Sequence, residues 1–324
     1  MPLTPLTTGD ALVALAASQG GVLLTAQAIS GGYPARALER RLLNDGWVRI
    51  YRGAWAAPGY GAVDDLLRIR AVQLRHPKLV ASHRAAAALH DIELLVDRLE
   101  FSGPPGSRST VGGGGVVHRL PLAALTEEVV EVAGVRVTSV PRTLADLLRG
   151  ATREEALVAV ESAVGVRRSR RVEGAFRRPG ITMLHEIDDA LGRASVASAS
   201  GTKAALETLS MADPAAGSPA ETVARLRMYE AGLRPRTQVT LVTPSGRRVR
   251  PDFLFVGEGL VVEIEGYRWH GSRAAHRDDV RRFNELQACR EVRRVLRFTA
   301  YEVFHGPQRM LREIRQGLAD LSPL

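Results

Sequence analysis

The first part of the chain shows apolar positions at helical spacing and then an alternating segment. Residues 10–18, 25–30 and 34–45 each carry apolar side chains spaced as on one face of a helix. The third segment places three leucines on one face: Leu38, Leu42 and Leu43. Residues 47–56 then alternate, as the two strands of a hairpin do. The order helix, helix, helix, hairpin predicts a domain over residues 1–62.

The middle of the chain, residues 63–150, mixes both kinds of spacing. Helical patterns are found at 64–74, 82–89 and 141–149. Short β-rich segments lie between them, at 99–102, 116–120, 128–132 and 135–138. The segment 103–115 is rich in Gly, Pro and Ser, which predicts a loop. We expect an α+β region here.

Residues 151–217 read as a helical connector followed by a linker. The segment 167–178 is a run of arginines, which is usually a solvated surface. The segment 195–217 has few bulky apolar residues and many Ala and Ser residues. We therefore place the linker there.

Residues 218–324 form the last predicted domain, in which strands and helices follow one another. The predicted elements are a helix, three strands, a helix, a strand and a helix, at 219–231, 238–242, 247–255, 260–265, 274–289, 292–299 and 307–318. Strands interleaved with helices are typical of an α/β domain. The chain is therefore expected to be multidomain, with α+β and α/β parts.

Three acidic residues fall on one face of a predicted strand pair in this domain. If residues 256–259 form the turn, Phe255 lies opposite Leu260, and counting back sets Asp252 opposite Glu263. Side chains two positions apart share a face, so Glu265 joins these two acids. The opposite face carries only apolar residues: Phe253, Phe255, Leu260, Val262 and Ile264.

Such a group of carboxylates needs a cation or raised pKa values, because like charges placed opposite each other destabilise a sheet. Hard oxygen ligands suit Mg²⁺ or Mn²⁺, which also bind water and substrate phosphate. Asp252, Glu263 and Glu265 are therefore candidate metal ligands and catalytic residues. The chemistry that follows is metal-assisted hydrolysis of a phosphodiester.

This stretch resembles the PD-(D/E)XK nuclease superfamily. Pro251-Asp252 matches its first element, and 263–265 falls where the second belongs. The run 262–270, with the segments that follow it, is similar to a branch related to very-short-patch repair endonucleases. The resemblance implies a restriction-endonuclease-like α/β domain. Position 265 holds Glu where the wider superfamily has lysine, so either His270 or an arginine substitutes for it, or the site is inert.

Other residues near this stretch are weaker candidates. Glu221 lies on the first helix of the domain, where related nucleases often place an acid, but Ser218 and Glu221 also form a capping box. His270 is a candidate general base or phosphate contact. The following helix carries three residues that could hold DNA phosphates or support the site: Arg281, Arg282 and Asn284.

The order of elements in residues 1–62 is that of a winged helix-turn-helix. The third helix would be the recognition helix, which enters the major groove of DNA. It carries Arg36 and Arg40 on one face, with Arg41 beside them. Arg49 and Arg52 lie on the hairpin, where they would meet phosphates. We expect these arginines to bind DNA.

Several segments resemble the abortive-infection type IV antitoxin (AbiEi) family. They are 24–27, 42–48 and 51–55 in the first domain, and 82–87 and 140–146 in the middle region. The resemblance implies a winged-helix regulator that can repress its own promoter, and it makes a toxin or defence-system protein a possible partner. His83 lies in one of these segments without a cysteine or acid at useful spacing, so we expect a structural role for it.

Composition agrees with nucleic-acid binding. The net charge is +9, and arginine supplies nearly all of the basic residues. Guanidinium groups bind phosphate in a bidentate way. A GC-rich genome would also raise the arginine count. Cys289 is the single cysteine, so no disulfide forms within the chain, which fits a cytoplasmic protein. We see no signal peptide or membrane span.

Three interpretations remain. The chain is a DNA-binding protein with an Mg²⁺- or Mn²⁺-dependent endonuclease domain, or an antitoxin-like repressor whose nuclease fold is inactive, or a defence or mobile-element component that acts with a partner protein. The residue that divides the first two is Glu265.

Overall fold

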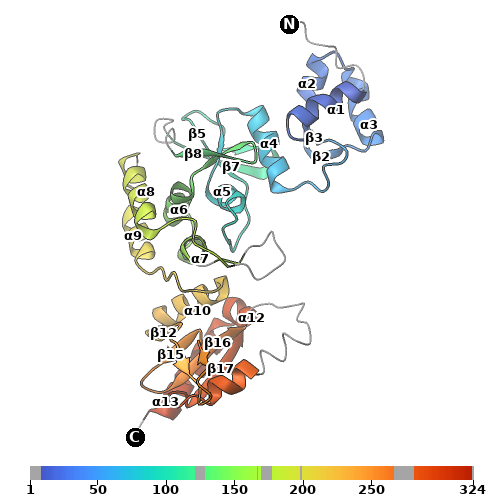
Figure 1. The fold of residues 1–324 in the computed structure, drawn as a ribbon. Helices are drawn as coiled ribbons and strands as arrows, with labels where there is room; N and C mark the ends of the chain where they lie inside the picture. The colour runs from blue at the N-terminus through green and yellow to red at the C-terminus, as the bar shows by residue number, and fades with distance from the viewer. Residues whose placement is uncertain are drawn as a thin grey trace. The chain divides into compact units, whose positions relative to one another are not determined.

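The computed structural model describes residues 9–120, 128–165, 167–168, 177–197, 199–265 and 281–322. The chain forms two compact units, which are drawn in Figure 1. The first unit comprises Met1–Ala151 and Leu184–Glu207, and the second comprises Thr152–Met183 and Thr208–Leu324. Both units combine helices with β-sheet. No helix in the described residues is long and apolar enough to cross a membrane.

The N-terminal part of the first unit contains the three helices and the hairpin that the sequence predicts. Its elements are α1 (Gly9–Ser18), β1 (Val22–Leu24), α2 (Thr25–Ser30), α3 (Ala35–Asn44), β2 (Val48–Tyr51) and β3 (Ala54–Ala56). The short strand β1 was not predicted, and it pairs with β3 at the edge of a sheet of order β1-β3-β2. Leu38 and Leu42 are buried, but Leu43 is 54% exposed, which corrects the predicted apolar face.

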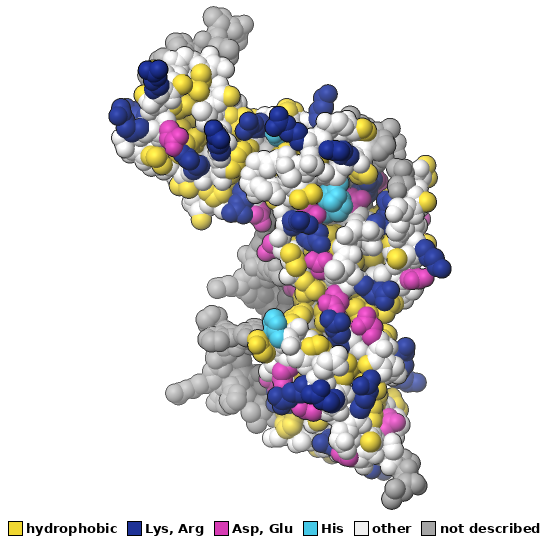
Figure 2. Space-filling model, turned by 180° about the vertical axis from the view of Figure 1, so that it is seen from behind, with side chains coloured by type: hydrophobic (Ala, Val, Ile, Leu, Met, Phe, Trp, Pro, Cys, Tyr) yellow, Lys and Arg dark blue, Asp and Glu magenta, His cyan; other side chains and the backbone are white. Residues whose placement is uncertain are grey.

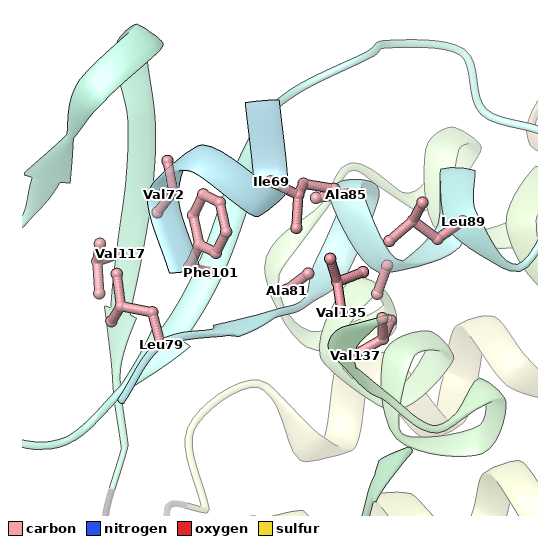
Figure 3. Close-up of a cluster of buried hydrophobic side chains, with 11 residues drawn as sticks. Ile69, Val72, Leu79, Ala81, Ala85, Leu89, Phe101, Val117, Val135 and Val137 are labelled. Carbon is pink, nitrogen blue, oxygen red and sulfur yellow. The ribbon is translucent and has the colours of Figure 1, made fainter. Parts of the chain in front are cut away.

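The middle part of the first unit is built on a six-stranded mixed sheet of order β6-β7-β5-β4-β9-β8. Its elements are α4 (Asp65–Arg75), β4 (Val80–Ala81), α5 (His83–Leu89), β5 (Glu100–Gly103), β6 (Thr110–Val111), η1 (Gly112–Gly114), β7 (Gly115–Arg119), β8 (Val129–Val132), β9 (Val135–Thr138) and α6 (Val140–Gly150). Figure 3 shows the core, in which α4 and α5 pack against the sheet around Phe101. Removing these apolar side chains from water is the main force that holds the layers together.

Helix α4 and the hairpin tie the N-terminal part to this sheet. Apolar residues of α4 pack on β1 and β3. The Arg70 guanidinium donates to the backbone oxygens of Gly20, at 3.0 Å, and Ala133, at 2.5 Å. Gly112 lies so close to the ring of Tyr51 that a Cβ would have no room. Helix α8 (Leu184–Ala197) and most of α9 (Thr202–Leu209) complete the unit.

The second unit has a four-stranded sheet of order β12-β15-β16-β17. Its described elements are α7 (Arg153–Val164), β10 (Arg167–Arg168), β11 (Arg177–Arg178), α10 (Pro219–Glu230), β12 (Arg236–Thr237), β13 (Leu241–Val242), β14 (Arg248–Val249), β15 (Phe253–Phe255), β16 (Leu260–Glu265), helical residues 281–287, β17 (Arg294–Thr299), α12 (Ala300–His305) and α13 (Pro307–Leu321). Strand β16 runs antiparallel to β15 and parallel to β17.

The units divide the chain differently from the four predicted segments. Helix α7, expected in a connector, packs in the second unit, where Glu161 forms a buried ion pair with Arg225 of α10. The predicted linker, 195–217, contains the helix α9. Burial explains both differences, since apolar faces of α7 and α9 contribute buried residues. The apolar spacing in these two segments was too weak to predict the buried faces of α7 and α9.

The predicted strands 238–242 and 247–255 are each interrupted. Between β12 and β13, Gln238 has a φ of 50°, which is left-handed backbone that no regular strand contains. Between β14 and β15 lies Pro251, which has no N–H to donate to a neighbouring strand. The predicted helix 274–289 is described only from residue 281 onward, where it is helical to residue 287.

Candidate functional site

The predicted register of β15 and β16 is confirmed. Residues 256–259 form the turn, and Phe255 lies opposite Leu260. Asp252 therefore lies opposite Glu263, and two hydrogen bonds join Asp252 to the end of β16. The Asp252 N–H donates to Oε1 of Glu263 at 3.2 Å, and Oδ2 of Asp252 accepts from the Ile264 N–H at 2.8 Å. These backbone bonds hold both carboxylates at one end of the strand pair.

The face that carries these acids is covered, which the sequence pattern did not predict. Leu254 and Val261 share this face and are buried, together with Leu286 of the following helical segment and Cys289. The predicted apolar face is buried as well. Strands buried on both faces hold their polar groups away from water, so Glu263 is a buried carboxylate.

Glu265 has different surroundings from the other two acids. It is exposed at the end of β16, and its Oε1 pairs with Nε of Arg297 on β17 at 2.6 Å. None of the interactions in the described part of the chain joins Glu265 to Asp252 or Glu263. The parallel pairing of β16 with β17 supplies the cation that takes up its charge.

Glu221 is the acid that comes close to Asp252 and Glu263. It caps the start of α10, where its carboxylate accepts hydrogen bonds from the Gly217 N–H and the Ser218 hydroxyl, both at 2.9 Å. Its charge also acts on Asp252, and that of Glu263 acts on Glu221. Glu221 therefore combines the capping contacts with a place among the acids. We call Glu221, Asp252 and Glu263 the acidic cluster.

The pKa values show that the acidic cluster carries poorly compensated charge. Burial, followed by the nearby Glu221 carboxylate, raises the pKa of Asp252 to about 7. Burial also raises the pKa of Glu263, and Asp252 adds to this. The pKa of Glu221 is raised by burial despite its capping hydrogen bonds. Three carboxyl groups that all resist ionisation are a place where a cation would be stabilised.

Gln238 belongs to this site and was not predicted. Its side-chain amide donates to Oε2 of Glu221 at 3.2 Å and also hydrogen-bonds the Asp252 carboxyl group. Its backbone N–H donates to the backbone oxygen of Asp252 at 3.1 Å. Its φ of 50° is strained for a residue with a side chain. Strained backbone collects at functional sites. The sequence offers no signal for it, since Gln238 simply begins a predicted strand.

Arg282 also reaches the acidic cluster. Its Nη1 lies 2.6 Å from Oε2 of Glu263, and its Nη2 donates to Oε1 of Glu263 and to the Arg250 backbone oxygen. Of the other candidates on this helix, Arg281 pairs with Glu285 and Asn284 is exposed. His270 lies outside the described residues.

The donor set fits a hard divalent cation bound by two carboxylates. No group of three or more His, Cys, Asp or Glu residues in the described ranges is arranged to hold a metal ion by itself. Mg²⁺, however, uses one or two carboxylates and takes its other ligands from water and substrate phosphate. Asp252 and Glu263 meet that smaller requirement, whereas the salt bridge of Glu265 turns it away from this role.

The N-terminal arginines fall into two groups. Arg41 pairs with Asp45 at 2.5 Å, and Arg49 pairs with Glu39 and lies over the ring of Trp55. The other three, Arg36, Arg40 and Arg52, are exposed, and none of the ion pairs found among the described residues involves them. On the face drawn in Figure 2, basic side chains gather over this part of the chain. The second group therefore differs from the first in having no ion pair among the described residues.

A second polar network lies in the first unit around His83. The Ser82 hydroxyl lies 3.0 Å from Nδ1 of His83, and the ring stacks on His118 at 3.8 Å. His118 in turn lies 3.1 Å from Glu100, which also accepts from Arg84. Burial lowers the pKa of His83 to about 4, so its ring is neutral at pH 7. These contacts suit the structural role expected for His83, although an acid lies closer than the sequence suggested.

Comparison with known proteins adds little about function. No protein-family model matches the chain. Two uncharacterized proteins of Mycobacterium tuberculosis, from strains CDC 1551 and H37Rv, are each 28% identical over 251 residues. The matches cover 77% of this chain and 85% of each relative. The similarity therefore extends over both units without naming an activity.

Proposed function

We propose that the chain is a DNA-binding protein whose second unit is a metal-dependent endonuclease that hydrolyses DNA phosphodiester bonds. The observation that carries the proposal is the acidic cluster, in which burial and mutual repulsion raise the pKa values of three carboxyl groups. Such an arrangement destabilises the fold unless a cation binds. The likeness of 251–265 to the PD-(D/E)XK nucleases supports the same conclusion.

In this proposal Asp252 and Glu263 hold Mg²⁺ or Mn²⁺, and Glu221 adds negative charge from α10. The bound metal would activate a water molecule and neutralise the scissile phosphate. Gln238 keeps Glu221 and Asp252 together by hydrogen-bonding both carboxyl groups. With Glu265 paired to Arg297, the lysine of the wider superfamily has no replacement at that position. Among the described arginines, Arg282 lies close enough to the acidic cluster to take the place of that lysine.

We further propose that the N-terminal part is a winged-helix module that brings the chain to DNA. The order α1, β1, α2, α3, β2, β3 is that of a winged helix, with α3 as the recognition helix. Arg36 and Arg40 of α3 and Arg52 of the hairpin turn would bind phosphates and base edges. We expect the protein to act in the cytoplasm.

A second candidate function is an antitoxin-like repressor that binds DNA without cutting it, with a toxin or defence-system protein as partner. Two observations favour it: Glu265 stands at the lysine position, and Arg282 already neutralises part of the charge of Glu263. Both functions need the N-terminal module to bind DNA. They differ only in what the acidic cluster does.

Cleavage of plasmid and linear DNA separates the two functions. The wild type and an Asp252→Asn, Glu263→Gln double variant would be incubated with Mg²⁺ or Mn²⁺. These substitutions keep hydrogen-bond acceptors for the Ile264 and Asp252 amides but remove the charges. Nicking by the wild type alone supports the nuclease. DNA binding by both proteins with cleavage by neither supports the repressor. A Glu265→Gln variant is the control, and we expect it to cut as the wild type does.

A further inference from the structure

Arg282 is held in the second unit by a set of contacts that an ordinary surface arginine lacks. Both of its terminal nitrogens bind the Glu263 carboxylate, at 2.6 and 3.2 Å, and Nη2 also donates to the Arg250 oxygen at 2.8 Å. Bidentate contact with a carboxylate is the strongest pairing that a guanidinium makes. The side chain nevertheless remains 45% exposed, so it can leave without opening the core.

The preceding residue shows that this placement is specific. Arg281 lies on the same helical segment, has a side chain that is 70% exposed, and pairs with Glu285. Arg282, in contrast, lowers the pKa of all three carboxyl groups of the acidic cluster. Neighbouring arginines of one helix thus differ in whether they compensate the buried acids.

A divalent metal at Asp252 and Glu263 would need the oxygens that Arg282 now contacts. Oε2 of Glu263 accepts from Arg282, and Oε1 accepts from both Arg282 and the Asp252 amide. Arg282 and the Asp252 amide together occupy three of the four lone-pair positions of this carboxylate, so a metal ion binds it less well while the guanidinium stays. The two cations also repel each other. Metal and guanidinium therefore compete for Glu263.

We propose that Arg282 is an exchangeable counter-ion of the acidic cluster, which holds Glu263 in the metal-free protein and is displaced when a divalent metal binds. The proposal rests on the proposed metal site and adds a regulatory element to it. Arg282 sets a threshold, because a metal ion must be concentrated enough to replace it. The metal-free protein in turn keeps its acids partly neutralised and its fold intact.

Calorimetric titration of the full chain with Mn²⁺ tests the proposal. Loss of a partly exposed competing ion pair should tighten binding about two- to fivefold in Arg282→Gln. Arg281→Gln is the matched control, and its affinity should equal that of the wild type. Arg282→Lys keeps the charge but loses the bidentate contact, so we expect an intermediate affinity. Circular dichroism and thermal unfolding show whether each variant is folded.

Each outcome separates this proposal from the nuclease proposal. If the wild type binds Mn²⁺ and Arg282→Gln binds it no more tightly, the counter-ion role is wrong while the metal site stands. If Mn²⁺ binds only after Arg282 is replaced, Arg282 is a fixed partner of Glu263 that the metal does not displace, so the exchange proposed here is wrong and the natural protein is better explained as a repressor. If neither protein binds Mn²⁺, both proposals are wrong. Should Arg282→Gln fail to fold, Arg282→Lys decides by the same comparison.

Discussion

Two buried acids, one in each unit, have pKa shifts of opposite sign. In the first unit Glu100 is buried, but Arg84 and His118 bind its carboxylate, and their hydrogen bonds lower its pKa to about 2 although burial by itself would raise it. In the second unit Asp252 has too little positive charge nearby, and its pKa rises to about 7. Burial is common to both acids, so the partners decide the direction of the pKa shift.

This difference separates buried acids whose charge is matched within the protein from buried acids whose charge is not. Arg142 of the first unit is 2% exposed and binds both Glu128 and Asp146, so its charge is matched within the protein. The acidic cluster holds three carboxyl groups whose described cationic partner is the half-exposed Arg282. Excess buried charge reduces stability, which makes the acidic cluster a candidate functional site.

Removing the buried cation Arg142 of the first unit should have the largest effect. Arg142→Met leaves Asp146 buried without this guanidinium and Glu128 with the more exposed Arg193, which we expect to lower the free energy of unfolding by about 3–5 kcal/mol. Urea denaturation measures the change. Arg193→Met is the control, since Arg193 also binds Glu128 but is 57% exposed, and it should cost less than about 1 kcal/mol. Equal losses of stability in the two variants would show that the effect of these ion pairs does not depend on burial of the arginine.

Removing Asp252 from the acidic cluster should instead raise the free energy of unfolding at neutral pH. Because the pKa of Asp252 is about 7 in the fold against an ordinary value of 3.8, the wild type loses stability as pH rises from about 4 to about 7. Asp252→Asn should remove the part of that loss that Asp252 causes and be more stable at pH 8, by on the order of 3 kcal/mol. Thermal unfolding from pH 4 to 8 without metal tests this. Glu265→Gln should keep the wild-type profile, and an unstable Asp252→Asn would contradict the comparison.

Glu100 should give the reverse pH dependence. Its pKa of about 2 lies below the ordinary 4.5, so the stability that its ionised form contributes is present above about pH 4.5 and is lost as pH falls toward 2. Glu100→Gln should lower stability at pH 7 by about 2–3 kcal/mol and flatten the acid side of the profile. Denaturation measured from pH 2 to 7 would show it. A variant as stable as the wild type at pH 7 would mean that Arg84 and His118 do not stabilise the ionised acid.

The smallest expected effect concerns Gln238. Gln238→Ala removes a hydrogen-bond donor to Asp252, so the pKa of Asp252 should rise above its wild-type value. The lost hydrogen bond is worth on the order of 1 kcal/mol. Carbon-detected NMR titration of the Asp252 carboxyl group measures this shift. Gln238→Asn, with a shorter amide, separates hydrogen bonding from backbone strain. An unchanged titration in Gln238→Ala would exclude Gln238 from the site.

Several features of this protein were determined by the sequence alone, and they are local ones. The alternation on either side of a four-residue turn sets Asp252 opposite Glu263, because a strand has a period of two and the turn length sets the register. The helices and the hairpin of the N-terminal part follow from helical spacing and turn residues in the same way. The identity of these two acids as a pair was therefore predictable.

The remainder of the site was decided only by tertiary structure. Glu221 approaches Asp252 because α10 packs beside the sheet, and Glu265 departs because the parallel neighbour β17 presents Arg297. Helix α7 joins the second unit through Glu161 and Arg225, which are 64 residues apart in sequence. Such contacts depend on how elements that are far apart in sequence pack together. Hydrophobic periodicity is a local pattern and does not record them. The pattern thus revealed which acids are paired, whereas packing determined which charges surround them.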